Sequence, residues 1–106
     1  MNDINLSLLS LKKARELFIR HLEKSERSNN TIIAYDGDLK QLEEFLIGLG
    51  LTNIDQVVAE NLETFKKQLE KEKYTPKSIS RKLNSIKSFF KFLLQEGAIS
   101  QDPARS

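Results

Sequence analysis

Apolar residues recur at spacings of three and four along most of the chain, which is the pattern of helices with one buried face. Four stretches carry this pattern, at Leu8, Leu11, Ala14, Phe18 and Leu22; at Ile32, Tyr35, Leu39, Leu42 and Leu46; at Leu62, Phe65 and Leu69; and at Ile79, Leu83, Ile86, Phe90 and Leu93. The sequence shows neither the alternation typical of strands nor an internal repeat. The pattern therefore predicts an all-α fold.

Capping residues set the expected ends of these helices. We expect helices from Ser7 or Ser10 to about Lys24, from Ser28 or Asn30 to about Ile47 and from about Ala59 to Lys73, with one short helical turn at Ile54 to Val58. The third helix has few apolar residues, so we expect it at the margin of the core. The fourth is the best delimited, because Thr75 suits an N-cap, Pro76 the first helical position and Gly97 the residue after a helix end.

The length of 106 residues predicts one domain with a single modest core. We expect residues 1–6 to be loosely ordered, as termini usually are, and residues 7–100 to form the domain. Residues 101–106 are expected to begin a linker that leaves it.

The two signs of charge are separated along the chain, although the net charge is only +2. Residues 29–65 contain seven acidic side chains and one lysine, whereas residues 66–95 contain nine basic side chains and two acidic ones. From residue 73 to residue 95 there is no Asp or Glu at all. Such asymmetry favours nucleic acid or another anionic surface as the partner.

Several classes of site and location are disfavoured by the composition. The chain has no cysteine and a single histidine, His21, so it offers no disulfide framework and no Cys/His metal cluster. No run approaches the roughly 18 apolar residues that span a bilayer, and the N-terminus lacks a signal-peptide pattern. Tyr35 lies on an apolar face, and Tyr74 has no base cluster beside it. We therefore expect a cytoplasmic chain without catalytic residues, cofactor, metal, small-molecule ligand or membrane partner.

The fourth helix combines an apolar side with a cationic side. We predict that DNA is bound by Lys77, Ser78, Arg81, Lys82, Asn84, Lys87, Ser88 and Lys91. The lysines and Arg81 would contact phosphates, and Arg81 and Asn84, one turn apart, are also the candidates for base edges. The alternative is a solvated face that is basic for solubility.

The start of the second helix is the other candidate for DNA contact. Asn30 and Thr31 would bind a phosphate together with the free N–H groups there, assisted by Lys40. The alternative is that these residues only cap the helix.

Taken together, these segments resemble the N-terminal core-binding, SAM-like domain of tyrosine recombinases, the phage integrases and Xer-type recombinases. The matching residues are, in order, Asn30, Thr31, Tyr35, Asp38 and Leu39; Ser78, Arg81, Leu83, Ile86, Lys87, Phe89 and Phe90; and Gly97, Asp102 and Pro103. The resemblance covers roughly residues 10–104. It departs from the family at Asp36 and Gly37, where a basic residue is usual, and at Lys87, where Arg is commoner.

The resemblance implies an orthogonal bundle of four main helices that forms half of a clamp on duplex DNA. The second and fourth helices would cross the major-groove side of a recombination half-site. In the family a separate catalytic domain follows, with two Arg, a His or Lys set and a Tyr nucleophile, and the full-length proteins assemble on DNA. This chain is therefore expected to be the non-catalytic DNA-binding part of a tyrosine recombinase.

Two features leave alternatives open. Gly37, in the middle of a helix, either costs about 1 kcal/mol relative to alanine or marks the close approach of another backbone or a ligand. Phe92 either widens the core, covering the first helix or the C-terminal turn, or contacts a neighbouring subunit. If the Phe-rich side of the fourth helix were the binding surface, the chain would instead be a small helical protein–protein interaction domain.

Overall fold

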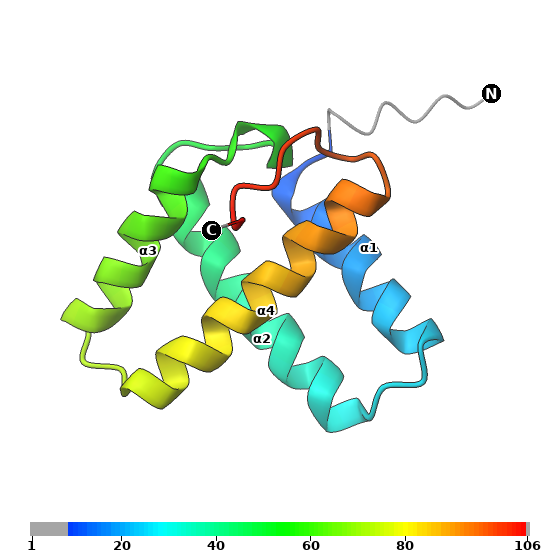
Figure 1. The fold of residues 1–106 in the computed structure, drawn as a ribbon, viewed down its shortest axis with the longest axis horizontal. Coiled ribbons are helices and arrows are strands. Elements are labelled where there is room, and N and C mark those ends of the chain that lie inside the picture. Colours follow the sequence, from blue (N-terminus) through cyan, green and yellow to red (C-terminus); the bar gives the residue numbers. More distant parts are fainter. Residues whose placement is uncertain (1–8, 106) are drawn as a thin grey trace.

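The structure, a computed structural model, describes residues 9–105 and consists of four helices and one 3-10 turn. They are α1 (Leu11–Lys24), α2 (Asn29–Gly48), η2 (Ile54–Gln56), α3 (Ala59–Lys71) and α4 (Pro76–Gln95). Figure 1 shows α2 and α4 crossing at the centre of the molecule, with α1 and α3 on opposite sides of the crossing. The only strand-like pairing in the described part is an isolated bridge between Ser10 and Asn53. The predicted all-α fold is confirmed.

Side-chain caps fix the starts of three helices. Ser10 Oγ accepts from the backbone N–H of Lys13, and Ser28 Oγ accepts from that of Thr31, each at 3.1 Å. Thr75 Oγ1 caps α4 in the same way, with Pro76 in the first turn. Of the alternative starts expected for the first two helices, Ser10 and Ser28 are thus the ones used. The expectation that residues 1–6 are loosely ordered lies outside the described residues.

The core lies where the apolar faces of all four helices meet. Its most deeply buried large side chains are Leu39, Leu42, Leu46, Ile54, Phe65, Leu69, Ile86, Phe90 and Leu93. The third helix, expected at the margin of the core, lies to one side of the crossing of α2 and α4, with Phe65 and Leu69 only 2% and 0% exposed. Although α3 has few apolar residues, the three predicted for its core face, Leu62, Phe65 and Leu69, are all buried.

The chain after α4 folds back onto the bundle. Gly97 adopts a left-handed conformation (φ 79°), as its position predicted, and the backbone N–H of Ala98 donates to the carbonyl of Leu93 at 2.9 Å. Ala98 and Ile99 are buried, and Ala104 packs against the core. Figure 1 shows this last segment passing from the end of α4 to lie between α3 and α4. The packed part of the domain thus extends beyond residue 100 into the segment expected to begin a linker.

A half-buried arginine joins α1 to α2. Arg15 donates from Nη1 to Asp36 and from Nε to Glu43, both at 2.7 Å. Partial burial lowers the pKa of Arg15, but the bonds to Glu43 and Asp36 outweigh it, and the pKa is raised above its ordinary value. The acidic residue that departs from the family pattern, Asp36, therefore has a structural partner in this chain.

The glycine in the middle of α2 is not in contact with another segment. A Cβ added at Gly37 would meet nothing within 4 Å, and the residue is exposed. Close approach by another backbone of the described chain is thereby excluded. A tolerated cost or the approach of a ligand are the explanations left.

Candidate nucleic-acid interface

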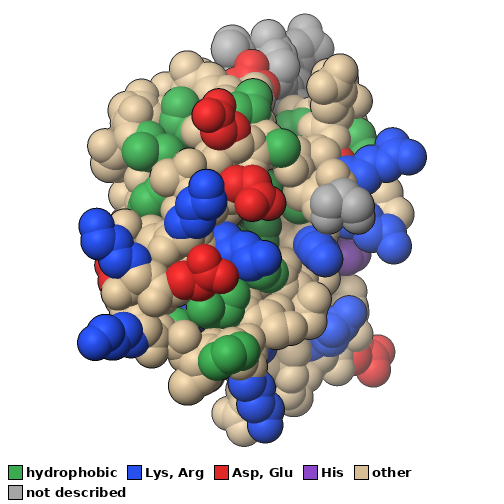
Figure 2. Space-filling view, turned by 60° about the vertical axis from the view of Figure 1, so that its left-hand side comes forward, with side chains coloured by type: hydrophobic (Ala, Val, Ile, Leu, Met, Phe, Trp, Pro, Cys, Tyr) green, Lys and Arg blue, Asp and Glu red, His purple; other side chains and the backbone are tan. Residues whose placement is uncertain are grey.

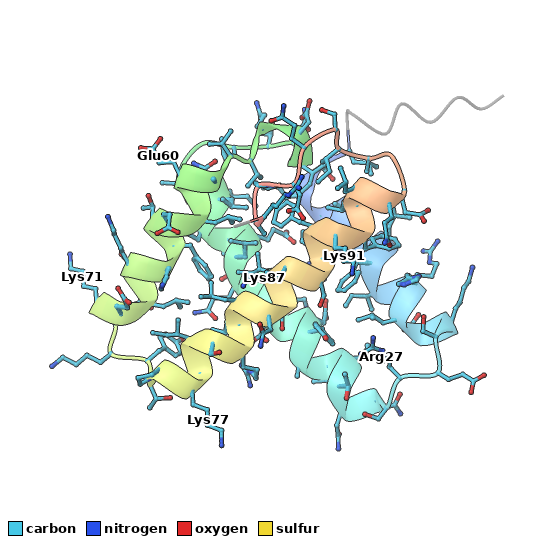
Figure 3. The ribbon with its side chains drawn as sticks, viewed as in Figure 1. Arg27, Glu60, Lys71, Lys77, Lys87 and Lys91 are labelled. Carbon is cyan, nitrogen blue, oxygen red and sulfur yellow. The ribbon has the colours of Figure 1, made fainter. Side chains whose placement is uncertain are left out.

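The exposed face of α4 carries three lysines that no acidic side chain neutralises. Lys77, Lys87 and Lys91 are exposed, and within residues 9–105 none has a carboxylate oxygen within the 4.0 Å of an ion pair. Figure 3 shows them along the length of the helix. They lie on one side of α4 because its residues 79, 86, 89, 90 and 93 are held in the core on the other. The cationic face predicted from the sequence is present at these positions.

The other two cations of α4 are bound to a buried carboxylate of α2. Asp38, 3% exposed, accepts from Arg81 Nη2 at 2.7 Å and from Lys82 Nζ at 3.2 Å. It also accepts from Ser85 Oγ at 2.8 Å. The Arg81 side chain is 57% exposed, whereas that of Lys82 is 10% exposed and its ammonium lies 5.1 Å from the ring centroid of Tyr74.

The prediction that Lys82 belongs to the DNA-contacting face is therefore wrong in its placement. Lys82 follows Ile79 by three positions and precedes Ile86 by four, so helical geometry turns it toward the core. There it compensates Asp38, a carboxylate that would be costly to bury alone. Its burial and its bond to Asp38 argue against a direct contact with DNA.

Asp38 and Ser85 were not predicted as part of this surface from the sequence. A signal for Asp38 existed, because it interrupts the apolar stripe of α2 between Tyr35 and Leu42. A polar residue on an apolar face is expected to have a buried partner. The spacing does not tell which residue that partner is.

A groove between α2 and α4 brings several predicted residues together. Its lining residues are Thr31, Ala34, Tyr35, Asp38, Arg81, Asn84 and Ser85. The start of α2 and the middle of α4 thus share one surface, although 50 residues separate Thr31 from Arg81 in the chain. Asn84 is exposed there, and Ser78 and Ser88 of the same helix are half-buried.

The first turn of α2 is capped by Ser28, not by Asn30 or Thr31. Thr31 Oγ1 accepts from Ser28 Oγ at 2.8 Å, and Asn30 is exposed in the first turn. The capping alternative therefore does not account for Asn30. Lys40, further along α2, is exposed, but its Nζ forms an ion pair with Asp36 Oδ2 at 3.6 Å.

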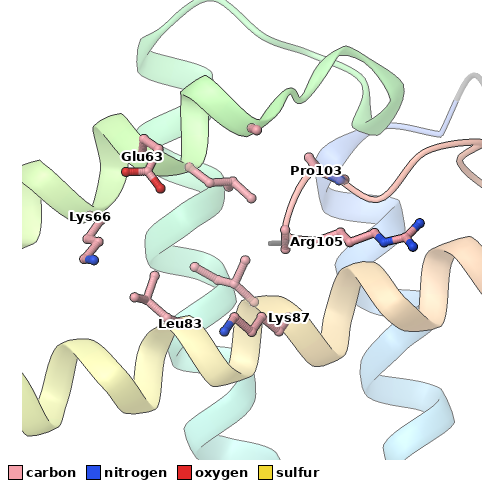
Figure 4. Close-up of a pocket in the computed structure, with 10 residues that line it drawn as sticks. Glu63, Lys66, Leu83, Lys87, Pro103 and Arg105 are labelled. Atoms are coloured by element: carbon pink, nitrogen blue, oxygen red, sulfur yellow. The ribbon is translucent and has the colours of Figure 1, made fainter.

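A second groove lies between α3, α4 and the C-terminal segment. Lys66, Lys87 and Arg105 line it together with Glu63, above an apolar floor (Figure 4). On the side of the molecule turned forward in Figure 2, Lys and Arg side chains are interspersed with acidic ones. On this side of α4, the surface that Lys87 borders is therefore of mixed sign.

The tyrosines and the histidine do not form a nucleophilic cluster with one another. The Tyr35 ring meets Phe18 edge-on at 5.9 Å and packs against the core, as predicted. Tyr74 accepts a hydrogen bond from Gln41 Nε2 at 3.0 Å. His21 is exposed, with its ring 4.7 Å from that of Phe92. In the described residues, no group of three His, Cys, Asp or Glu is placed to hold a metal ion.

The Phe-rich side of α4 faces the core rather than solvent. Phe89 and Phe90 are buried in the core. Phe92 is half-buried, and its ring lies 5.4 Å from that of Phe18, so it covers α1. This packing removes the surface on which the alternative of a protein–protein interaction domain was based. Separately, none of the helices in the described part has the length and apolar character needed to cross a membrane.

Comparison with known proteins places most of the chain in one family. The family model described as phage integrase, N-terminal SAM-like domain, matches residues 16–97. Tyrosine recombinase XerC of Roseiflexus castenholzii is 37% identical over 89 residues, which cover 83% of this chain and 28% of the relative. Tyrosine recombinase XerC of Anoxybacillus flavithermus is 32% identical over 104 residues, covering 97% and 32%. This chain thus spans about a third of the length of these curated relatives.

A solved structure has the same fold. It is the N-terminal domain of a phage integrase/site-specific recombinase from Haloarcula marismortui, with a TM-score of 0.83 and 91% of each chain covered. Sequence identity to it is 16%, so this similarity bears on the fold alone.

Proposed function

Because the chain belongs to the phage integrase N-terminal SAM-like domain family, we propose that it is the DNA-binding domain of a site-specific tyrosine recombinase. It grips duplex DNA of a recombination half-site with the exposed face of α4 and the N-terminal half of α2. Cutting and rejoining of strands belong to a catalytic domain outside these 106 residues, and self-assembly on DNA belongs to the full-length protein. A DNA partner is also the reason to expect a cytoplasmic location.

The observation that supports this proposal most directly is the unneutralised charge on α4. Lys77, Lys87 and Lys91 have no acidic partner within residues 9–105, and α4 itself contains no Asp or Glu. A row of free cations on one rigid helix matches the spaced phosphates of a nucleic-acid backbone.

The groove between α2 and α4 adds groups that suit DNA in other ways. Arg81 can read a guanine edge, because it offers two N–H donors to the acceptors N7 and O6, and Asn84 can read an adenine edge, because its amide offers one donor and one acceptor. Asn30, Thr31, Ser78 and Ser88 offer polar groups for phosphate, and Lys40 extends the cationic surface along α2.

The experiment that tests this proposal measures binding to a fluorescein-labelled 30-base-pair duplex of mixed sequence between 50 and 200 mM salt. Log affinity falls with log salt at a slope of about −0.9 per phosphate contact, so Lys77→Ala combined with Lys91→Ala should reduce the magnitude of that slope by about 1.8. The matched control is Lys67→Ala combined with Lys71→Ala, two exposed lysines of α3. Equal slopes for the two double variants would count against the proposal.

A further inference from the structure

Asp38, the buried carboxylate under the groove between α2 and α4, has a role beyond joining the two helices. We infer that it is a positioning residue, which holds the Arg81 guanidinium in the groove ready for an acceptor on DNA. The inference rests on the proposed function, because it assigns the arrangement of one residue at that same surface.

Three side chains of α4, those of Arg81, Lys82 and Ser85, donate to this carboxylate, and two of the three are buried. Lys82 and Ser85 are buried, and they donate to different oxygens of Asp38, Lys82 to Oδ1 and Ser85 to Oδ2. Asp38 therefore keeps a donor on both oxygens even without Arg81. The bond from Arg81 is not needed to satisfy the buried group.

Arg81 is the partner that reaches the surface. Its Nη2 is bound to Asp38 at 2.7 Å while 57% of its side chain is exposed. Within residues 9–105, this is the hydrogen bond that its guanidinium makes. A guanidinium held at one nitrogen keeps its remaining N–H groups in a fixed plane. An incoming phosphate or base can accept hydrogen bonds from these groups without the cost of first ordering a flexible side chain.

The same geometry also allows Asp38 to weaken DNA binding, and an experiment can distinguish this effect from positioning. If Asp38 acted only by its charge, it would neutralise Arg81 and repel DNA, so removing the carboxylate would tighten binding. If Asp38 instead holds the Arg81 guanidinium in place, removing the carboxylate charge releases Arg81. DNA binding is then weaker, although the net charge of the protein rises by one. The two possibilities therefore predict changes of opposite sign.

The test compares Asp38→Asn with Asp36→Asn in binding to the same 30-base-pair duplex at 50 mM salt. Both variants make the same change in net charge on the same helix, and Arg15 keeps its bond to Glu43 when Asp36 changes. We expect Asp38→Asn to weaken binding about tenfold, the size of one well-placed arginine contact. Asp36→Asn should leave binding unchanged or tighter. Tighter binding by Asp38→Asn would overturn the inference.

A second measurement separates positioning from a structural role. In the Arg81→Ala background, Asp38→Asn should change the Kd less than twofold, because the residue through which it acts is gone. In the unbound protein, the ¹⁵N–¹H heteronuclear NOE of Arg81 Nε should fall in Asp38→Asn. An equal loss of affinity in both backgrounds, or an unchanged NOE, would contradict the positioning role.

If Asp38→Asn does not fold, Arg81→Lys gives the answer at an exposed position. Lysine keeps the charge but lacks the planar fork, so we expect about tenfold weaker binding, and wild-type affinity would overturn the inference. Failure of the proposed function has a different signature. In that case the Lys77/Lys91 double variant would bind as the wild type does, whereas failure of the inference alone leaves that variant weakened.

Discussion

At the scale of single residues, Arg81 and Lys82 show how one step along a helix separates two roles. Successive residues of a helix point about 100° apart, so one of two adjacent cations faces the groove and the other faces the core. Both bind Asp38, but only Lys82 is enclosed with it. The positive charge of Arg81 thus lies at an exposed surface, whereas that of Lys82 belongs to a buried ion pair.

Lys82→Ala should lower the free energy of unfolding by about 2 kcal/mol, because it removes a donor from a buried carboxylate. Arg81 and Ser85 remain on Asp38, which keeps the loss below that of an orphaned charge. Urea unfolding followed by circular dichroism measures the change. Lys77→Ala, on the exposed face, should stay within about 0.5 kcal/mol of the wild type. If the two variants lost equal stability, the buried pair would have no structural value.

The sequence predicted the surface lysines of α4 better than it predicted the buried pair. Lys77, Lys87 and Lys91 were assigned to the exposed face from helical spacing alone, because that assignment needs no knowledge of another helix. The spacing of Lys82 from Ile79 and Ile86 already turns it toward the core, but its partner Asp38 lies 44 positions away, and a one-helix pattern carries no information about such a partner.

At the scale of elements, helix starts were predictable where a side chain caps the backbone. Ser10, Ser28 and Thr75 each cap their own helix, so the signal is local in sequence. The end of α3 was expected at Lys73, yet the helix ends at Lys71, and Lys73 takes a left-handed conformation (φ 68°). Left-handed lysine is uncommon, and composition gives no warning of it.

Phe92 tests the packing of α4 on α1. Phe92→Ala should lower the free energy of unfolding by about 2 kcal/mol, less than the cost at a fully buried phenylalanine, because the ring covers Phe18 but is only half-buried. Leu94→Ala, two residues on and 38% exposed, is the control and should cost about 1 kcal/mol or less. Thermal and urea unfolding measure both. A Phe92 variant as stable as the control would reopen the alternative of contact with a neighbouring subunit.

At the scale of the whole molecule, folding leaves most of the charge separation in place. The acidic part of the chain is α2 with the residues that follow it, and within the described residues only Asp38 of that part forms ion pairs with α4. Asp36 and Glu43 are instead occupied by Arg15 of α1. The cationic face of α4 therefore survives folding: Asp36 and Glu43 are bound elsewhere, and within the described residues the carboxylates of the acidic part other than Asp38 form no ion pair with α4.

The return of the C-terminal segment is a whole-molecule feature that the sequence indicated only in part. Asp102 Oδ1 accepts from the backbone N–H of Ala104 at 2.8 Å, a local turn around Pro103 that reverses the chain. The turn residues were visible in the sequence, and they were interpreted as a linker. What they could not show is that Ala104 meets the core, because that contact is made with distant helices.

Two truncations test how far the packed domain extends. Removal of residues 101–106 should lower the free energy of unfolding by about 1 kcal/mol, since it exposes the surface that Ala104 covers. Removal of residues 98–106 should cost about 3 kcal/mol more, because Ala98 and Ile99 are 2% and 9% exposed and their loss opens the core. Urea unfolding of the two truncated chains beside the 106-residue chain measures both steps. Equal stability of the two truncated chains would mean that the buried pair after Gly97 adds nothing, and the domain would then end with α4.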